Sequence, residues 1–333
     1  MTQTVREPGT KKKLDSPRGA DSTIGREPRD NPRPEKSLEM NRNANDHRSV
    51  MMIIASMVIF GTIGVFRRYL PVSSAFLACS RGLLGGLCIL LFTRLTGRKR
   101  EPVPRRALAG LIVSGALIGV NWMLLFEAYN HTTVAVATLC YYMQPTIVML
   151  LSPLIFRERL TARKAVCAAV AVAGMVLVSG VLGDGGSGGS LRGVLLGLGA
   201  AVFYSAVVIM NKKITGIDAY QKTTVQLLSA GAVMIPYMLL TGGAGAEGFT
   251  PGTAALLLAV GIVHTGIAYV LYFGSMDGLR VQTVAILSYI DPVSALLFSA
   301  LLLREPLSLP GVIGAVMIIG SVVISETGKT ETA

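Results

Sequence analysis

The stretch Tyr142-Met-Gln-Pro145 recurs 147 residues later in the chain, with Pro145 mapped onto Pro292, as Tyr289-Ile-Asp-Pro292. The same ungapped offset aligns further pairs of identical or similar residues: Gly119 with Gly266, Trp122 with Tyr269, Phe126 with Phe273, Arg157 with Arg304, and Glu158 with Glu305. Chance is a poor explanation for one offset that holds at so many positions. The sequence therefore predicts an internal duplication.

Long apolar segments surround both copies of this stretch. Of the 333 residues, 51% are hydrophobic and 15% are charged, whereas soluble chains carry about 25% charged residues. A helix needs about 20 apolar residues to cross a bilayer. Ten segments approach that length: 49–66, 72–95, 107–128, 132–155, 164–182, 191–211, 220–241, 252–274, 280–303 and 308–325. We therefore predict an all-α integral membrane protein with ten transmembrane helices.

The ten segments divide into two halves of five, residues 49–182 and 191–325, joined by a Gly-rich linker at 183–190. Because five is odd, the second half enters the membrane upside down, which gives two inverted five-helix repeats. Such repeats are typical of secondary transporters, whose substrate lies near the bilayer midplane where helices are interrupted. Pro145 and Pro292 are the predicted interruptions and hinges. A proline removes one backbone donor and frees a carbonyl one turn earlier, here at Tyr141 and Ser288.

Lysine and arginine gather near the N-terminus and in alternate loops, which accounts for the formal net charge of +12 without nucleic-acid binding. Residues 1–48 show no apolar periodicity, so we expect a disordered basic tail, and residues 326–333 form a short C-terminal tail. Loops after the second, fourth and sixth spans are basic, whereas those after the third and seventh hold no Lys or Arg. This bias predicts a cell-membrane protein with both termini in the cytoplasm. Four arginines fall on the predicted outer side against the trend: Arg67, Arg68, Arg192 and Arg304.

Six short motifs, three in each half, carry a family resemblance. They are Asn121-Trp-Met-Leu-Leu-Phe-Glu-Ala-Tyr129, Tyr141-Tyr-Met-Gln-Pro145, Phe156-Arg-Glu-Arg-Leu-Thr161, His264-Thr-Gly-Ile-Ala-Tyr269, Leu287-Ser-Tyr-Ile-Asp-Pro292 and Leu303-Arg-Glu-Pro306. Together they resemble the EamA-type branch of the drug/metabolite transporter superfamily, over roughly residues 50–325. The resemblance implies ten helices in two inverted halves around a central cavity. It also implies export or exchange of amino acids, other metabolites or toxic compounds, without fixing the substrate.

Arg81, Asp291 and His264 lie well inside predicted spans, where inserting a charge costs about 2.5–3.5 kcal/mol, so each is a functional candidate. Arg81 is predicted either to bind a substrate carboxylate or to hold the bundle together through an internal acid or carbonyls. Asp291 is predicted to take up a proton, to bind a cationic amine, or to make a structural hydrogen bond at the helix break. His264 is predicted to relay a proton, to bind substrate, or only to pack. Asp291 and Tyr289 differ by two residues, so they are predicted to point to different faces.

Aromatic and neutral polar residues complete the predicted substrate site, because rings hold apolar and cationic groups. With Arg81 and His264, the set is Asn121, Trp122, Tyr141, Tyr142, Gln144, Tyr269, Gln282 and Tyr289. Outside the site, Glu127 is predicted to pair with His131. Glu158 and Glu305, each beside an arginine, are predicted to form structural ion pairs that fix the loops after the fourth and ninth spans. Two GxxxG patterns, at 115–119 and 193–197, predict close helix contacts.

We therefore expect a secondary transporter that works by alternating access, most simply an exporter of amino acids or related metabolites. The alternative is an exporter of organic cations, with Asp291 in a tyrosine cage as the cation site. An intramembrane enzyme is a remote alternative, because the chain has no HExxH or DDxxD motif and only three histidines. No metal or cofactor is predicted. The expected partners are a small-molecule substrate, the lipid bilayer and protons acting through Asp291 and His264, and both a monomer and a homodimer stay open.

Overall fold

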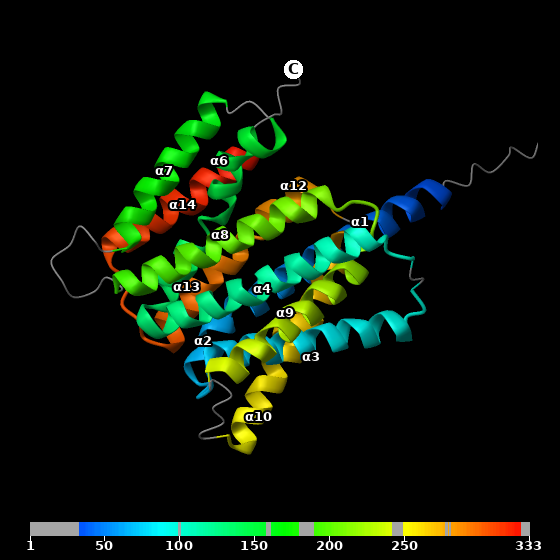
Figure 1. Cartoon of the computed structure of the whole chain (residues 1–333). Helices are drawn as coiled ribbons and strands as arrows, with labels where there is room; N and C mark the ends of the chain where they lie inside the picture. The colour runs from blue at the N-terminus through cyan, green and yellow to red at the C-terminus, as the bar shows by residue number, and fades with distance from the viewer. Residues whose placement is uncertain are drawn as a thin grey trace, which may run out of the picture. The chain divides into compact units, whose positions relative to one another are not determined.

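The computed structural model describes residues 33–98, 101–157, 161–179, 190–241, 249–276, 279 and 281–327, without the side chains of 33–46, 281–282, 285 and 326–327. Throughout this part of the chain all regular structure is helical (Figure 1). The elements are α1 (Arg33–Gly61), α2 (Ile63–Arg68), α3 (Ser74–Leu95), α4 (Arg105–His131), α5 (Val134–Tyr141), α6 (Gln144–Phe156), α7 (Ala162–Ser179), α8 (Leu191–Lys213), α9 (Ala219–Thr241), α10 (Pro251–Leu258), η1 (Ala259–Ile267), α11 (Ala268–Met276), α12 (Val281–Leu287), α13 (Ile290–Leu302) and α14 (Leu309–Thr327). Residues 43–333 belong to one unit, and the contacts below lie within it.

Seven helical segments are long and apolar enough to cross a membrane. They are His47–Arg68, Ser74–Leu95, Arg105–His131, Val134–Phe156, Leu191–Lys213, Ala219–Thr241 and Pro251–Met276. The other three expected spans correspond to α7, to the pair α12–α13, and to α14, of which Ile290–Leu302 and Leu309–Ser325 are apolar but shorter. Every expected span therefore has a helical counterpart, and the predicted all-α, ten-helix membrane fold is confirmed.

The first helix begins earlier than expected. The sequence predicted a disordered tail up to residue 48, whereas α1 already starts at Arg33. Pro34 fits the first turn of a helix, where its missing N–H costs no helical hydrogen bond. Glu35 and Lys36 follow it, and both residue types favour helix. These local preferences outweigh the polar composition that suggested disorder.

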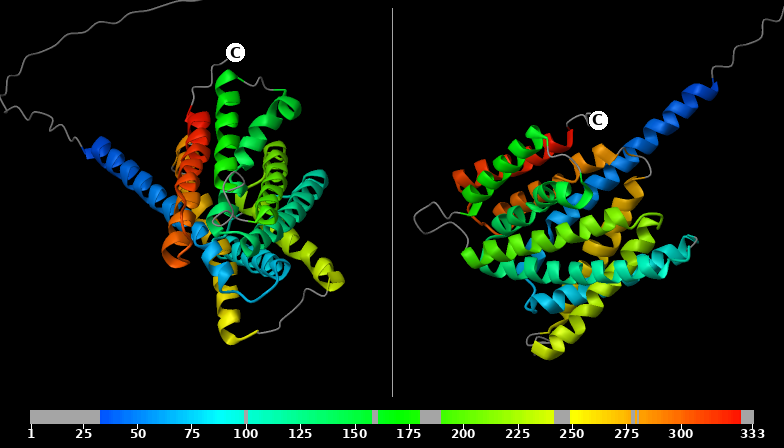
Figure 2. Two further views of the ribbon diagram at one scale, coloured as in Figure 1. Left: turned by 90° about the vertical axis from the view of Figure 1, so that its left-hand side faces the viewer. Right: turned by 45° about the horizontal axis from the view of Figure 1, so that its top comes forward.

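The packing of the helices is that of two repeats related by an approximate two-fold axis. Helices that lie beside such an axis pack against their own counterparts. The second spans of the two halves, α3 and α9, form one such pair, and the fifth spans, α7 and α14, form another. α7 and α14 lie side by side in Figure 1 and in both views of Figure 2. The contact of α4 with α9 has its counterpart in the contact of η1 with α3.

Both predicted interruptions are present, within one residue of equivalent positions under the offset. α5 and α6 are separated by a turn at 142–143, and α12 and α13 by a turn at 288–289. Pro145 and Pro292 lie in the first turn of the helix that follows each break, where no intrahelical N–H bond is lost. One detail of the expectation was wrong. The Ser288 carbonyl is not freed, because it accepts the N–H of Asp291 at 3.3 Å as the helix restarts.

A second backbone feature follows the same symmetry. Among the described residues, two that are not glycine have positive φ, Arg157 at 58° and Arg304 at 54°. The offset of the duplication relates these two arginines, and each directly follows a half-helix or the turn that ends it. The left-handed conformation is costly for residues with a Cβ. Its presence in both copies indicates that the chain turns sharply after each of these half-helices.

The two halves differ in the eighth span. Residues 259–267 form the π-helix η1, where the sequence predicted a continuous α-helix, and the equivalent residues of the first half lie within α4 and are α-helical. Single turns of π-helix occur frequently at functional sites, because they shift side chains out of the α-helical register. The shift affects His264 and Thr265, both buried.

Both GxxxG patterns lie at close helix contacts, as predicted. A Cβ at Gly119 of α4 would lie 2.7 Å from the Ala230 carbonyl oxygen of α9. A Cβ at Gly197 of α8 would lie 3.0 Å from the Cys140 Cβ of α5. Only a small residue lets these backbones approach so closely. The contacts hold the helices of the two repeats together around the breaks.

Candidate substrate site

A hydrogen bond joins the two helix breaks. The Tyr142 hydroxyl, in the turn after α5, donates to Asp291 Oδ2 at 2.5 Å. Asp291 lies in the first turn of α13, where the positive end of the helix dipole favours a negative charge. Because Tyr142 belongs to the first repeat and Asp291 to the second, the bond connects the halves at the point where each helix is interrupted.

Arg81 of α3 is the second charged group at this level. Its side chain is buried, its Nε donates to Thr265 Oγ1 at 2.9 Å, and its Cζ lies 4.1 Å from the centre of the Trp122 ring. Seating the guanidinium on an indole face offsets part of the cost of burying it. Arg81 has no acidic partner within hydrogen-bond distance in the described part of the chain. It does lie within electrostatic range of Asp291.

The sequence left open whether Arg81 binds a substrate carboxylate or holds the bundle together, and the structure shows which groups it contacts. Arg81 is anchored by a hydroxyl and an aromatic ring, not by an internal carboxylate. A guanidinium has five N–H donors in a fixed fork, and Arg81 uses one of them in its bond with Thr265. Among the residues that the structure describes, no other protein group accepts from Arg81. The remaining donors are available in the arrangement that binds a carboxylate.

The π-helix η1 carries Thr265, which bonds Arg81, and His264, which bonds Thr62. The Thr265 hydroxyl accepts from Arg81 and donates to the Val260 carbonyl at 3.1 Å, a bond across five residues. His264, the residue before Thr265, makes a 2.8 Å hydrogen bond between its Nε2 and Thr62 Oγ1. The Thr62 hydroxyl donates to the Ile59 carbonyl, so it accepts from Nε2. His264 is thus held against the junction of α1 and α2.

Aromatic rings surround the Tyr142–Asp291 bond. Tyr141 stacks on Tyr204 of α8 with ring centres 5.5 Å apart, and its other neighbour is Tyr142, edge-on at 5.8 Å. Tyr269 stacks on Phe273, with ring centres 5.7 Å apart. The four tyrosines and Asp291 are all half-buried. They combine apolar ring faces with hydroxyls, as a site for an amphipathic ligand requires.

Tyr204 is the residue that sequence reasoning missed. The offset of the duplication gives it no aromatic counterpart. The matches under that offset lie in the third, fourth, eighth and ninth spans, so the site was predicted from those spans. The available signal was a hydroxyl in the middle of an otherwise apolar span, in a helix that the inverted topology places beside the fourth span.

The other predicted site residues have different surroundings. Asn121 is fully buried and its Nδ2 donates to the Ala200 carbonyl at 2.6 Å, which ties α4 to α8. Gln144 begins α6, and its backbone carbonyl accepts from the Ser205 hydroxyl at 3.2 Å. Tyr289 lies half-buried in the turn before α13. The side chain of Gln282, in α12, lies outside the described residues.

The predictions made for the acidic residues have mixed outcomes. Glu127 pairs with His131 at 3.1 Å, as expected. Glu305 forms an ion pair, but its partner is Arg68 at 2.8 Å and not the adjacent Arg304. Glu158 and the linker 183–190, apart from Ser190, lie outside the described residues. No group of three or more His, Cys, Asp or Glu side chains that could hold a metal occurs in the part that the structure describes.

Two repeats, each with a helix break, joined by the Tyr142–Asp291 hydrogen bond, are the architecture of a ten-helix membrane transporter. Residues 47–180 and 191–327 each match the EamA-like transporter family. The chain belongs to this family, and the two matched segments coincide with the two repeats. The resemblance inferred from the motifs is therefore confirmed.

Individual relatives agree with this assignment. An uncharacterized transporter of Bacillus subtilis (strain 168), YxxF, is 27% identical over 279 residues, which cover 83% of this chain and 89% of that protein. Protein PecM of Dickeya dadantii (strain 3937) is 28% identical over 275 residues, 80% and 87% of the two chains. A solved crystal structure superposes with a TM-score of 0.59 at 19% identity, covering 83% of this chain and 96% of its own, which shows the fold alone.

Proposed function

We propose that the protein is a secondary transporter that exports a small zwitterionic metabolite, an amino acid or a related compound, across the cytoplasmic membrane by alternating access. Both termini lie in the cytoplasm in this proposal, as the loop charges predict. The observation that carries it is the pair Arg81 and Asp291. Asp291 lies at a helix break, Arg81 carries the opposite charge within electrostatic range of it, and Arg81 has no acid bonded to it in the described part of the chain.

A zwitterion fits both charges at once. The free N–H groups of Arg81 bind the substrate carboxylate, since a guanidinium and a carboxylate form two parallel hydrogen bonds. Asp291 binds the ammonium group and exchanges the Tyr142 hydroxyl for it. Tyr141, Tyr204 and Tyr269 provide ring faces for the rest of the molecule. A cation without a carboxylate meets the charge of Arg81 instead, and an anion without an amine meets that of Asp291.

A proton gradient is the proposed energy source, with Asp291 as the group that carries the proton. Protonation removes the charge that holds the substrate ammonium, so the two events exclude each other, as exchange of a proton for substrate requires. His264 is not included, because both of its ring nitrogens face Thr62 and the η1 backbone. If transport continues unchanged after a protonophore collapses the proton gradient, this part of the proposal is wrong.

The test uses the full chain in proteoliposomes with three sets of radiolabelled solutes: amino acids, organic cations without a carboxylate, and carboxylates without an amine. We expect flux for amino acids, and loss of that flux in both Arg81→Ala and Asp291→Asn. Arg163→Ala removes an exposed cation that bonds the Ile324 carbonyl instead, and it should transport normally. Cation flux that survives or rises in Arg81→Ala would favour the organic-cation alternative, and no flux for any solute by folded protein would contradict the proposal.

A further inference from the structure

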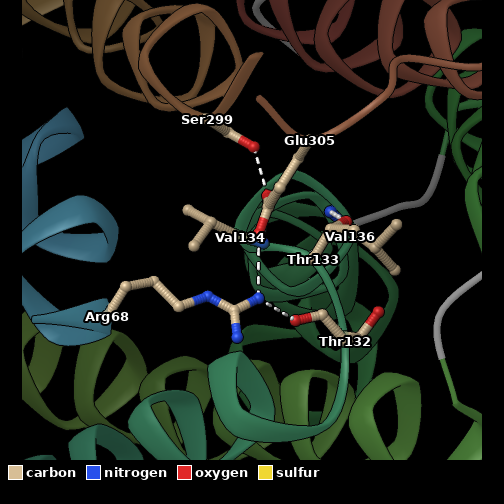
Figure 3. A network of polar contacts seen from close by, with 7 residues as sticks. All are labelled: Arg68, Thr132, Thr133, Val134, Val136, Ser299 and Glu305. Carbon is tan, nitrogen blue, oxygen red and sulfur yellow. Dashed lines mark hydrogen bonds and ion pairs between the residues drawn. The ribbon is translucent and has the colours of Figure 1, made fainter. Parts of the chain in front are cut away.

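Outside the substrate site, the described residues contain a polar network centred on Glu305, in the loop between α13 and α14. Glu305 Oε1 pairs with Arg68 Nη2 at 2.8 Å, and Oε2 accepts the Val134 N–H at 2.8 Å and the Ser299 hydroxyl (Figure 3). The same Arg68 nitrogen donates to the Thr132 carbonyl at 2.9 Å. Both carboxylate oxygens therefore have donors.

The network crosses between the repeats. Arg68 ends α2 and Val134 begins α5, both in the first repeat, whereas Ser299 and Glu305 belong to the second. Two of the three donors to Glu305 thus come from the opposite half. The carboxylate also caps the N-terminus of α5, where backbone N–H groups and the helix dipole favour a negative charge.

Glu127 shows that this arrangement is not general for acids in the fold. Its carboxylate accepts from Ser74, Asn130 and His131, and all three belong to the first repeat. Glu127 therefore fastens helices within one half. Glu305 joins two halves that must move relative to each other if access alternates.

The network acts on the same helices that carry the substrate site. α5 runs from Val134 to the break at Tyr142, and α13 runs from Asp291 toward Ser299 and Glu305. The two half-helices pack against each other and run in opposite directions between two polar links. One link is the Tyr142–Asp291 bond and the other is the Glu305 network, about 12 Å away along α5 at 1.5 Å per residue.

The exposure of the ion pair suits a contact that opens. The side chain of Arg68 is 35% exposed and that of Glu305 is 12% exposed. Ions at a water-accessible position can be rehydrated on separation, so the pair can break without leaving a charge unsatisfied. Arg304 precedes Glu305 in the left-handed conformation and turns the chain so that the carboxylate faces α2 and α5.

From this geometry we propose that Glu305 is a gate residue, and that its bonds to Arg68 and Val134 hold α13 against α2 and α5 and close one end of the transport path. The proposal rests on the proposed function. The loop charges assign this end to the outside of the membrane. Breaking the network lets α13 move away from α1, α2 and α5 on that side.

A thiol between the two links reports such an opening. Ser294 of α13 is buried, and it faces Gly61 of α1 so closely that a Cβ at Gly61 would collide with its hydroxyl. Ser294→Cys is a conservative change, made after the four native cysteines, Cys79, Cys88, Cys140 and Cys167, are replaced by alanine. A charged, membrane-impermeant methanethiosulfonate reagent is then added to the outside of right-side-out vesicles that carry the full chain.

We expect Glu305→Gln to speed labelling about fivefold to tenfold, because bonds to a neutral amide are weaker than bonds to a carboxylate. Arg68→Gln keeps the Val134 cap and should give a smaller increase. Glu127→Gln is the matched control and should leave the rate unchanged. Unfolding midpoints of all variants are measured in parallel, so that Arg68→Gln decides the question if Glu305→Gln does not fold.

Equal rates in all variants, equal increases for Glu305→Gln and Glu127→Gln, or acceleration only from the cytoplasmic side would overturn the proposal. Labelling does not depend on transport, so failure of the proposed function can be told apart. Faster labelling in a protein that moves no solute leaves the gate standing and removes the transport proposal. Normal zwitterion flux with no change in labelling removes the gate alone.

Discussion

The hydrogen bond between Tyr142 and Asp291 should stabilise the folded protein by coupling the two breaks. The perturbation is a double-mutant cycle of wild type, Tyr142→Phe, Asp291→Ala and the double variant. Interhelical hydrogen bonds in membrane proteins average about 0.6 kcal/mol in such cycles and reach about 1.7 kcal/mol. The bond here is 2.5 Å long with a carboxylate acceptor, and charge-assisted bonds are roughly twice as strong as neutral ones. We therefore predict a coupling energy of about 1–2 kcal/mol.

The assay is equilibrium unfolding by SDS in mild-detergent micelles. The chain has one tryptophan, Trp122, which is buried, so its fluorescence follows loss of the core without further labelling. The control cycle pairs Tyr141→Phe with Asp291→Ala, because Tyr141 contacts the ring of Tyr142 but donates no hydrogen bond to Asp291. A Tyr142–Asp291 coupling below about 0.3 kcal/mol, or one matched by the control cycle, would refute this reasoning.

Three further predictions concern stability. Gly119→Ala should lower the free energy of unfolding by about 1–3 kcal/mol, because the new Cβ meets the α9 backbone at 2.7 Å. The control is Gly320→Ala, where a new Cβ meets nothing within 4 Å, so this change should be neutral or stabilising by up to about 1 kcal/mol. Both free energies are measured from SDS unfolding curves. Arg304→Gly should raise the free energy of unfolding by about 1 kcal/mol by relieving the left-handed backbone, and a decrease in the same assay would argue against that strain. Trp122→Leu should lower the free energy of unfolding by about 0.5–2 kcal/mol beyond the loss of packing, because it removes the cation–π contact with Arg81. Circular dichroism melts of Trp122→Leu with and without Arg81→Ala measure that coupling.

The parts of the fold that repeat could be predicted from the sequence. Apolar length identified the ten spans, because a membrane helix must be long and apolar whatever its neighbours are. Pro145 and Pro292 located the breaks, since a proline lacks the N–H that a helix interior needs and fits only the first turn of a helix. The fixed offset then related the two breaks without any knowledge of the packing.

The contacts between distant residues could not be predicted in the same way. Arg68 and Glu305 are 237 residues apart in the chain, and nothing local pairs them. One signal was available. Arg68 is a basic residue on the predicted outer side, where few basic residues are expected, so an acidic residue on the same side is a natural partner for it. The π-helix around His264 had no signal, because it depends on how η1 packs against α3 and not on local composition.

The clustering of several candidate residues could be predicted from the sequence, and their binding of substrate stays a prediction. Arg81, Trp122 and the tyrosines at 141, 142 and 269 do gather near Asp291, since the inverted topology brings their helices together. Asn121 instead bonds a backbone carbonyl of α8. The difference arises because the NH2 group of a buried amide at a close helix contact donates to the nearest backbone carbonyl, while Oδ1 of Asn121 is buried without a partner among the described residues.

The central claim is that substrate binds between the repeats, beside the two helix breaks. It is tested most directly by substrate protection of a thiol introduced by Tyr204→Cys, in protein without the native cysteines. We predict that the amino acids transported in proteoliposomes slow labelling of this thiol by a small methanethiosulfonate reagent. They should not affect a thiol introduced by Arg192→Cys, at the exposed start of the same helix. If transported solutes leave the thiol at position 204 unprotected, or slow labelling equally at position 192, the substrate does not bind where this account places it.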